Sequence, residues 1–159
     1  MTSSPAHSPG LPELPDTELL HLDHQVCFSL QAASRAFGGV YRRALRDLGL
    51  TYPQYLAMMV LWEEGPLPVK TIGERLHLDS GTLSPLLKRL ESAGLVRRER
   101  SAEDERSVTV HLTDAGADLR ERALPVPRAI LRATGLSVQE VSALRETLGR
   151  LTDSLSRAV

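Results

Sequence analysis

The chain has 159 residues, of which 42% are hydrophobic and 25% are charged, and its formal net charge at pH 7 is −1. This length suits one folded domain with a hydrophobic core of useful size. The near-neutral charge predicts neither nucleic-acid nor membrane binding, so a DNA-binding surface must come from local placement of arginine and lysine. A single cysteine excludes an intrachain disulfide framework. No apolar run approaches the ~20 residues of a membrane span, and we expect a cytoplasmic protein.

The N-terminal segment MTSSPAHSPGLPELPD is rich in proline and serine and lacks the features of a signal peptide. We expect residues 1–15 to form a disordered tail. Asp16 can cap a helix that continues to about Leu48, because apolar residues recur at steps of three and four. Such a helix would be about 50 Å long. A small domain rarely needs this length, so we expect part of the helix to pack against a second chain, although Gly38-Gly39 weakens it.

The middle of the chain predicts three further helices. Pro53 begins PQYLAMMVLWEE, which is apolar on nearly all sides and therefore belongs to the core. The segment VKTIGERLHL predicts a short helix. The next helix, DSGTLSPLLKRLESAG, has Asp79 or Ser80 as its cap and ends at Gly94.

A hairpin and two C-terminal helical segments complete the chain. Apolar and polar residues alternate from Val108 to Leu112, which is strand periodicity, and SAEDER is a polar loop between two short strands. Thr113 can cap the helix DAGADLRERALPVPRAILRA, which we expect to bend or break at Pro125 and Pro127. Ser137 opens a final helix with leucines along one face.

This order of elements predicts a mainly α fold with a small β-hairpin wing, which is a winged helix-turn-helix. The N- and C-terminal helices then provide a dimerisation region. After the tail, we divide the chain into an N-terminal dimerisation helix (16–52), a winged helix-turn-helix DNA-binding region (53–112) and C-terminal dimerisation helices (113–159).

The helix after Asp79 is the candidate for reading DNA. Leu83, Leu87 and Leu90 form its buried stripe, and small or polar residues occupy the opposite side. Small residues allow close approach to a groove floor, while hydroxyl and basic side chains can bind phosphates or base edges. The proline on the exposed face removes a backbone hydrogen bond just inside the helix. A functional role explains this cost more easily than packing does. The residues of this opposite side are Gly81, Thr82, Ser84, Pro85, Lys88 and Arg89.

An alternative is that Lys88 and Arg89 merely form a solvated helix face. Arginines gathered on the hairpin, where a wing would meet the minor groove, favour the DNA-reading interpretation. Asp104 or Glu105 could brace the guanidinium of Arg106 for insertion into a narrow groove. The hairpin arginines are Arg97, Arg98, Arg100 and Arg106.

The segment LHLDSGTLSPLLKRLESAGLVRRERSAEDERSVTVHLTDAG resembles the DNA-binding half of the MarR family of winged-helix regulators. LDHQVCFSLQAASRAF and LTYPQYLAMMVLWEE are similar to the organic hydroperoxide resistance regulators (OhrR) of the one-cysteine type. The likeness runs from about Leu22 to Leu155. It implies a homodimeric repressor of a pseudopalindromic double-stranded operator, with Cys27 as its peroxide-sensing residue. The candidate DNA-binding residues are Ser80, Thr82, Ser84, Pro85, Lys88, Arg89, Arg100, Asp104 and Arg106.

Cys27 lies one residue off the apolar stripe of the first helix, at what we expect to be a boundary position. It could be a small hydrophobe buried at a dimer seam. The resemblance implies instead that Tyr41 and Tyr52 stabilise its thiolate. If the helix is unbroken, Tyr41 lies about 21 Å from Cys27, so it must come from the partner subunit. Gln31 departs from the family, since related regulators can carry an aromatic residue there.

The absence of a second cysteine restricts the oxidation chemistry of Cys27. An organic hydroperoxide would form a sulfenic acid, followed by a mixed disulfide with a small cellular thiol or by a sulfenamide. We expect this adduct to release the operator DNA. We predict neither an enzyme nor a bound cofactor.

Three other interpretations remain open. His21, His24 and Cys27 could bind a metal, although their spacing converges poorly on one ion. A thiol peroxidase would need an activated thiolate on a scaffold that the sequence does not indicate. The winged helix could also respond to a small aromatic ligand in the dimer crevice, in which case Cys27→Ser would remain inducible.

Overall fold

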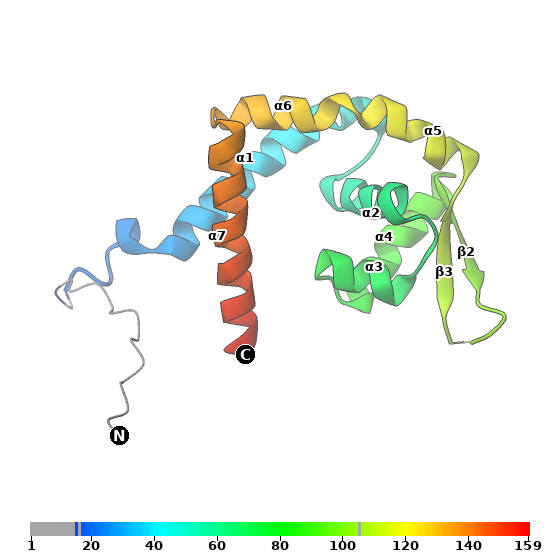
Figure 1. Ribbon diagram of the computed structural model, residues 1–159, viewed down its shortest axis with the longest axis horizontal. Helices are drawn as coiled ribbons and strands as arrows, with labels where there is room; N and C mark the ends of the chain where they lie inside the picture. Colours follow the sequence, from blue (N-terminus) through cyan, green and yellow to red (C-terminus); the bar gives the residue numbers. More distant parts are fainter. Residues whose placement is uncertain (1–14, 16, 105) are drawn as a thin grey trace, which may run out of the picture. The chain divides into compact units, whose positions relative to one another are not determined.

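The computed structural model describes residue 15 and residues 17–104 and 106–159 (Figure 1). The predicted tail, apart from Pro15, and the predicted helix cap Asp16 lie outside the described residues. The chain divides into two units, Met1–Phe37 and Gly38–Val159.

The first helix is shorter than its periodicity predicts. A 3₁₀ turn, η1 (Leu22–His24), precedes α1 (Val26–Ala44), so the prediction of one helix from Asp16 to Leu48 is wrong at both ends. Gln25 interrupts the helix because its backbone is extended, and its side-chain amide donates to the carbonyl oxygens of Leu19 and His21 at 2.6 and 3.2 Å. These bonds satisfy carbonyl groups that a continuous helix would have used. Gly38 and Gly39 lie inside α1 and do not break it.

A second 3₁₀ turn, η2 (Arg46–Leu48), links α1 to α2 (Tyr52–Glu64). Thr51 caps α2 and forms a reciprocal capping box with Gln54. The predicted core role of this helix is confirmed, since its buried residues fall on several sides of it. They are Tyr55, Ala57, Met58, Val60 and Leu61.

Helices α3 (Val69–Leu76) and α4 (Ser80–Ser92) form the helix-turn-helix. The turn has a left-handed residue, His77, with φ 53°. Gly73 permits close approach of the turn to α3, because a Cβ there would lie 2.8 Å from the carbonyl oxygen of Leu78. Asp79, rather than Ser80, caps α4, and its Oδ1 accepts from the backbone N–H of Thr82 at 2.9 Å.

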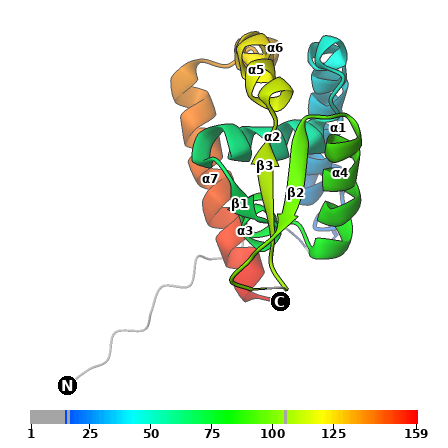
Figure 2. The same cartoon turned by 90° about the vertical axis from the view of Figure 1, so that its right-hand side faces the viewer.

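The wing is a three-stranded antiparallel sheet in the order β1-β3-β2, which Figure 2 shows with β3 in the middle. The predicted hairpin is confirmed as β2 (Val96–Arg100) paired with β3 (Val108–Leu112). The sequence pattern does not reveal β1 (Leu67–Pro68), because two residues are too few to show a period. Its proline is tolerated because β1 lies at the sheet edge.

The C-terminal part contains α5 (Asp114–Ala123), α6 (Pro125–Thr134) and α7 (Val138–Arg157). The predicted bend or break is confirmed at Pro125, where Leu124 separates α5 from α6, and is wrong at Pro127, which lies in the first turn of α6, where a proline is tolerated. Ser137 caps α7 through a capping box, as its sequence predicts. No residue of α7 is buried within the chain.

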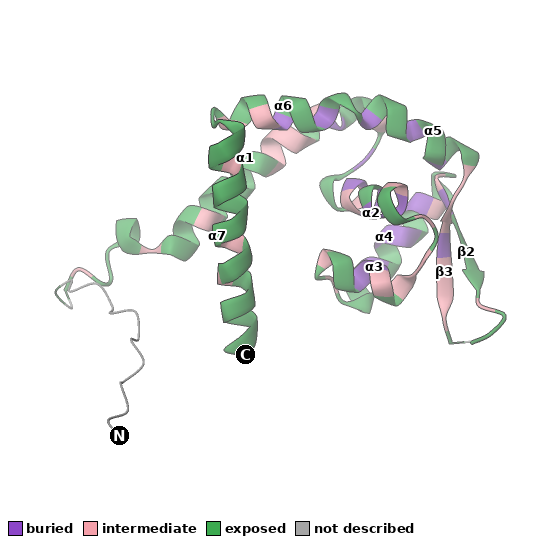
Figure 3. Cartoon of the chain, in the orientation of Figure 1, coloured by how far each residue is buried: buried purple, intermediate pink, exposed green. Residues whose placement is uncertain are grey.

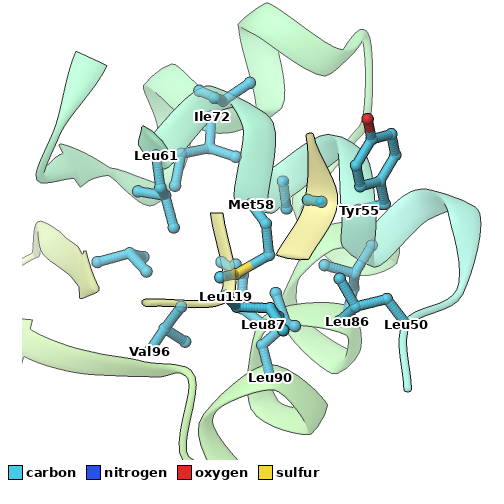
Figure 4. Packing of buried hydrophobic residues seen from close by; sticks show 14 of the residues in the cluster. Leu50, Tyr55, Met58, Leu61, Ile72, Leu86, Leu87, Leu90, Val96 and Leu119 are labelled. Atoms are coloured by element: carbon cyan, nitrogen blue, oxygen red, sulfur yellow. The ribbon is translucent and has the colours of Figure 1, made fainter. Parts of the chain in front are cut away.

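Most of the core of unit 38–159 lies inside the winged helix, and buried residues of α5 and α6 extend it. The buried residues of α2, α3, α4 and β3 lie inward, while the outer sides of α3 and α4 are exposed (Figure 3). Met58, Leu87 and Leu90 pack together between the elements (Figure 4). The Nε1–H of Trp62 donates to the carbonyl oxygen of Gly116 at 2.8 Å, which ties α2 to the start of α5.

Candidate functional site

The outward side of α4 carries every residue that the sequence predicts for DNA contact on this helix. Leu83, Leu87 and Leu90 are buried as predicted, and Leu86 joins them. These four leucines fix the rotation of α4, so its polar side is presented to solvent. The predicted contact residues on this side are all exposed: Ser80, Thr82, Ser84, Pro85, Lys88 and Arg89.

A groove of about 390 Å³ lies between α4 and the wing. It is lined from the helix by Ser80 and Ser84, from β2 by Arg98, and from the hairpin loop by Asp104 and Arg106. Lys70, at the start of α3, lines the same groove with a side chain that is 88% exposed. The sequence alone does not identify Lys70 as a contact residue, because only the tertiary arrangement brings the start of α3 beside the wing.

Glutamates engage two of the four hairpin arginines. The Arg98 guanidinium donates to the carboxylate of Glu91 on α4, at 2.8 and 3.0 Å. Arg97 pairs with Glu99 on its own strand. Among the described residues, Arg100 and Arg106 have no ion pair.

Asp104 shapes the loop rather than holding a guanidinium. Its Oδ1 accepts from the backbone N–H of Arg106 at 3.0 Å, while its own backbone carbonyl accepts from the N–H of Ser107 at 2.9 Å. The predicted brace of the Arg106 guanidinium is therefore wrong for Asp104, because a short aspartate at this turn position reaches the nearby backbone first. Glu105 lies outside the described residues.

Three tyrosines form a cluster at the junction of α1 and α2 in unit 38–159. The ring centroids of Tyr41 and Tyr52 are 4.2 Å apart, and those of Tyr41 and Tyr55 are 6.1 Å apart. Burial, followed by the charge of Tyr52, raises the pKa of Tyr41 to about 12. Burial also raises the pKa of Tyr55 above its ordinary value. Tyr41 therefore keeps its hydroxyl proton at neutral pH and can donate a hydrogen bond.

Cys27 lies in the first turn of α1 and is exposed. In the described part of the chain, Cys27 is more exposed than the predicted boundary position, and so are the apolar residues beside it on α1. Val26 and Phe28, its neighbours, are 65% and 40% exposed.

The described residues do not support the metal interpretation. They contain no group of three or more histidine, cysteine or acidic side chains that could hold an ion. The rings of His21 and His24 stack with centroids 5.9 Å apart, and Nδ1 of His24 lies 2.9 Å from the carbonyl oxygen of Glu18. No helix in the described part of the chain is long and apolar enough to cross a membrane.

Comparisons with known proteins agree with this architecture. A family described as "Transcriptional regulator SarA/Rot" matches residues 40–122. The organic hydroperoxide resistance transcriptional regulator of Bacillus subtilis (strain 168) is 47% identical over 136 residues, which is 86% of this chain and 92% of that protein. The chain belongs to the MarR/SarA family of winged-helix transcriptional regulators. It is a DNA-binding regulator of this family and not an enzyme.

Two further relatives support the family assignment. The HTH-type transcriptional regulator TtmR of Methylorubrum extorquens (strain PA1) is 51% identical over 134 residues, 84% of this chain and 69% of that protein. The structure of reduced AbfR bound to DNA has a TM-score of 0.75 and 38% identity, covering 89% of this chain and 99% of that one. AbfR, from Staphylococcus epidermidis, is also similar in its overoxidized, DNA-bound form, with a TM-score of 0.74 and 37% identity over 91% of this chain and all of that one.

Proposed function

We propose that this chain is a peroxide-sensing repressor of the cytoplasm. Its homodimer binds a pseudopalindromic operator while Cys27 is reduced and releases the operator when an organic hydroperoxide oxidises Cys27. The observation that carries this proposal is the close packing of two tyrosine rings, Tyr41 and Tyr52, in a chain whose single cysteine is exposed. The regulator of B. subtilis, named for organic hydroperoxide resistance, and the reduced and overoxidized forms of AbfR support it.

The tyrosines act as hydrogen-bond donors to the sulfur. A phenol with a pKa of about 12 stays neutral at physiological pH, and a neutral hydroxyl can donate to a thiolate. Because burial and the packed ring of Tyr52 hold Tyr41 in place, little side-chain entropy is lost when the bond forms. A thiolate held in this way is the form of cysteine that attacks a peroxide.

The donors to Cys27 come from the partner subunit. Cys27 and Tyr41 are fourteen residues apart in α1, which corresponds to about 21 Å of α-helix. The dimer is further supported by large apolar side chains that one chain leaves uncovered on α1 and α7. Among these, Phe28, Phe37, Leu144 and Leu155 are 40, 39, 44 and 58% exposed.

Oxidation of Cys27 proceeds in two steps. The thiolate of Cys27 attacks the terminal peroxide oxygen, the O–O bond breaks, and the alkoxide takes up a proton and leaves as an alcohol. The resulting sulfenic acid then reacts with a small cellular thiol, forming an S–S bond and releasing water. The bulky adduct displaces the tyrosine donors at the seam between two chains, and the spacing of the two α4 helices changes.

DNA binding uses the exposed side of α4 in the major groove and the hairpin tip in the minor groove. The two α4 helices of a dimer must meet half-sites about 34–36 Å apart. A shift of the interface between the two chains on oxidation therefore changes the affinity for the operator, although no DNA-contacting residue is altered. We assign contact roles to Lys70 and to eight of the nine residues predicted above, and we assign Asp104 the role of shaping the hairpin loop.

The test measures operator binding by reduced wild-type protein and by Cys27→Ser, with cumene hydroperoxide and with or without glutathione. Because the operator is unknown, the duplex is selected from a random library by the reduced wild-type protein. We expect the hydroperoxide with glutathione to release wild-type protein and leave Cys27→Ser bound. Tyr41→Phe, which removes one donor, should slow oxidation. Release of Cys27→Ser by the hydroperoxide would refute the sensor, and full release without glutathione and without an adduct in the mass spectrum would refute the mixed disulfide.

A second candidate is a repressor gated by a small aromatic acid. An open pocket of about 390 Å³ between α2 and the α5–α6 segment favours this function. Met59, Trp62 and Leu124 provide an apolar lining and Arg120 a positive charge. Salicylate that released both wild-type protein and Cys27→Ser from DNA would support this candidate over the redox sensor.

A further inference from the structure

The arginines of β2 lie on two different faces of the hairpin. Along β2, Val96, Arg98 and Arg100 share one face, and Arg97 and Glu99 share the other, because side chains alternate along a strand. Val96 is buried, so its face is directed toward the domain. Arg98 therefore begins on the side of α4, which lies beside β2 (Figures 1 and 2).

Glu91, in the last turn of α4, accepts three hydrogen bonds from Arg98. One carboxylate oxygen accepts from the backbone N–H at 3.0 Å, and the other accepts from Nε and Nη2 at 3.0 and 2.8 Å. The Arg98 bonds hold the pKa of Glu91 below its ordinary value. The two side chains are only 36% and 32% exposed. The carboxylate thus binds both the side chain and the main chain of the strand.

These hydrogen bonds attach the start of β2 to the last turn of α4, the helix predicted to read DNA. Glu91 and Arg98 are separated by a tight turn that contains Gly94 with φ 74°. Closing that turn with three hydrogen bonds fixes the direction in which β2 leaves α4. Arg100 lies two residues further along the same strand, and Arg106 lies in the loop beyond it, so their positions depend on that direction.

We propose that Glu91 and Arg98 are positioning residues that hold the wing at its DNA-binding angle, and that Arg98 does not contact DNA. Only Arg100 and Arg106 among the four hairpin arginines then neutralise DNA phosphates or enter the minor groove. Arg97 is compensated by Glu99 on the other face. The proposal depends on the DNA binding of the family and is independent of the chemistry of Cys27.

Substitution of Glu91 distinguishes a positioning role from a purely electrostatic one, because a carboxylate near DNA repels the phosphates. If only charge mattered, Glu91→Gln would strengthen binding. If Glu91 positions the wing, the same substitution weakens it, since a neutral amide oxygen is a poorer acceptor for a guanidinium. The amide keeps an acceptor for the backbone N–H, so Glu91→Gln perturbs the fold less than deletion of the side chain.

The experiment measures affinity of reduced protein for the selected duplex between about 50 and 200 mM salt. We expect Glu91→Gln and Arg98→Ala each to lose roughly fivefold in affinity with an unchanged salt slope. Their double variant should be no weaker than the weaker single variant, because both remove one interaction. Arg106→Ala should reduce the slope by about 0.9, the value for one phosphate contact. Arg97→Ala is the matched control and should change affinity less than twofold.

Two results would overturn the proposal. The first is an Arg98→Ala slope that falls as far as that of Arg106→Ala, which would make Arg98 a phosphate contact. The second is unchanged or tighter binding by Glu91→Gln. Thermal unfolding checks that each variant is folded, and if Arg98→Ala is not, Arg98→Lys replaces it, since lysine keeps the charge and loses the paired donors.

Discussion

Replacement of Gly116 by alanine gives a stability prediction that follows from close packing between α5 and the turn before β2. A Cβ at this position would lie 2.0 Å from the carbonyl oxygen of Leu95 and 3.3 Å from Cδ2 of Leu112. The oxygen belongs to the backbone and cannot rotate away. Ordinary contact therefore requires the start of α5 to move by more than about 1 Å from the turn.

Three hydrogen bonds hold this junction and would be strained by that movement. Trp62 Nε1–H donates to the carbonyl of Gly116 at 2.8 Å, and Thr113 donates its hydroxyl to Gly94 at 2.6 Å and its backbone N–H to Leu95 at 3.1 Å. At about 1 kcal/mol each, their loss costs about 3 kcal/mol. Alanine regains up to about 1 kcal/mol as a better helix former. The free energy of unfolding should fall by about 2 kcal/mol.

Urea unfolding at one fixed protomer concentration measures this change, because association contributes to the stability of a dimer. With a slope of about 2 kcal/mol per molar, the midpoint should fall by about 1 M. Gly149→Ala in α7 is the control, since no described atom outside the adjacent residues and backbone of its own helix lies within 4 Å of the added Cβ. It should leave the midpoint unchanged or raise it slightly. Equal midpoints for Gly116→Ala and Gly149→Ala would refute the packing argument.

Three further predictions test the core, a cap and the tyrosine cluster. Leu87→Ala should reduce the free energy of unfolding by about 2–5 kcal/mol in urea, because the side chain is fully buried between α4 and its neighbours, and a loss below about 1 kcal/mol would contradict this. Ser137→Ala should cost about 1 kcal/mol by removing the side-chain cap of α7, visible as a lower thermal midpoint, whereas an unchanged midpoint would show that the cap contributes little. Because burial raises the pKa of Tyr41 to about 12, its stabilising contribution is present below pH 10 and is lost as the pH rises from about 10 to about 12. Phenolate absorbance should show a titration step near pH 12 that Tyr41→Phe removes, while the raised titration of Tyr55 remains. Persistence of the step near pH 12 in that variant would assign it to another tyrosine.

Periodicity and capping chemistry predict most of the fold. The leucines of α4, the alternation in β3 and the caps Thr113 and Ser137 each identify an element and its buried side, because these signals act within a few residues. The prediction was wrong where a side chain competed with the helix, as Gln25 does before α1, and where an element was too short to show a period, as β1 is.

The sequence by itself determined the order of the helices, the winged helix and the exposed side of α4, because helical and strand periods dictate which residues are buried. Only the tertiary structure decided which charges remain available: Glu91 engages Arg98, and Asp104 binds the backbone instead of a guanidinium. It also brought the rings of Tyr41 and Tyr52 together from either side of a turn. These pairings depend on distances between elements, and a linear pattern of residue types contains no such distances.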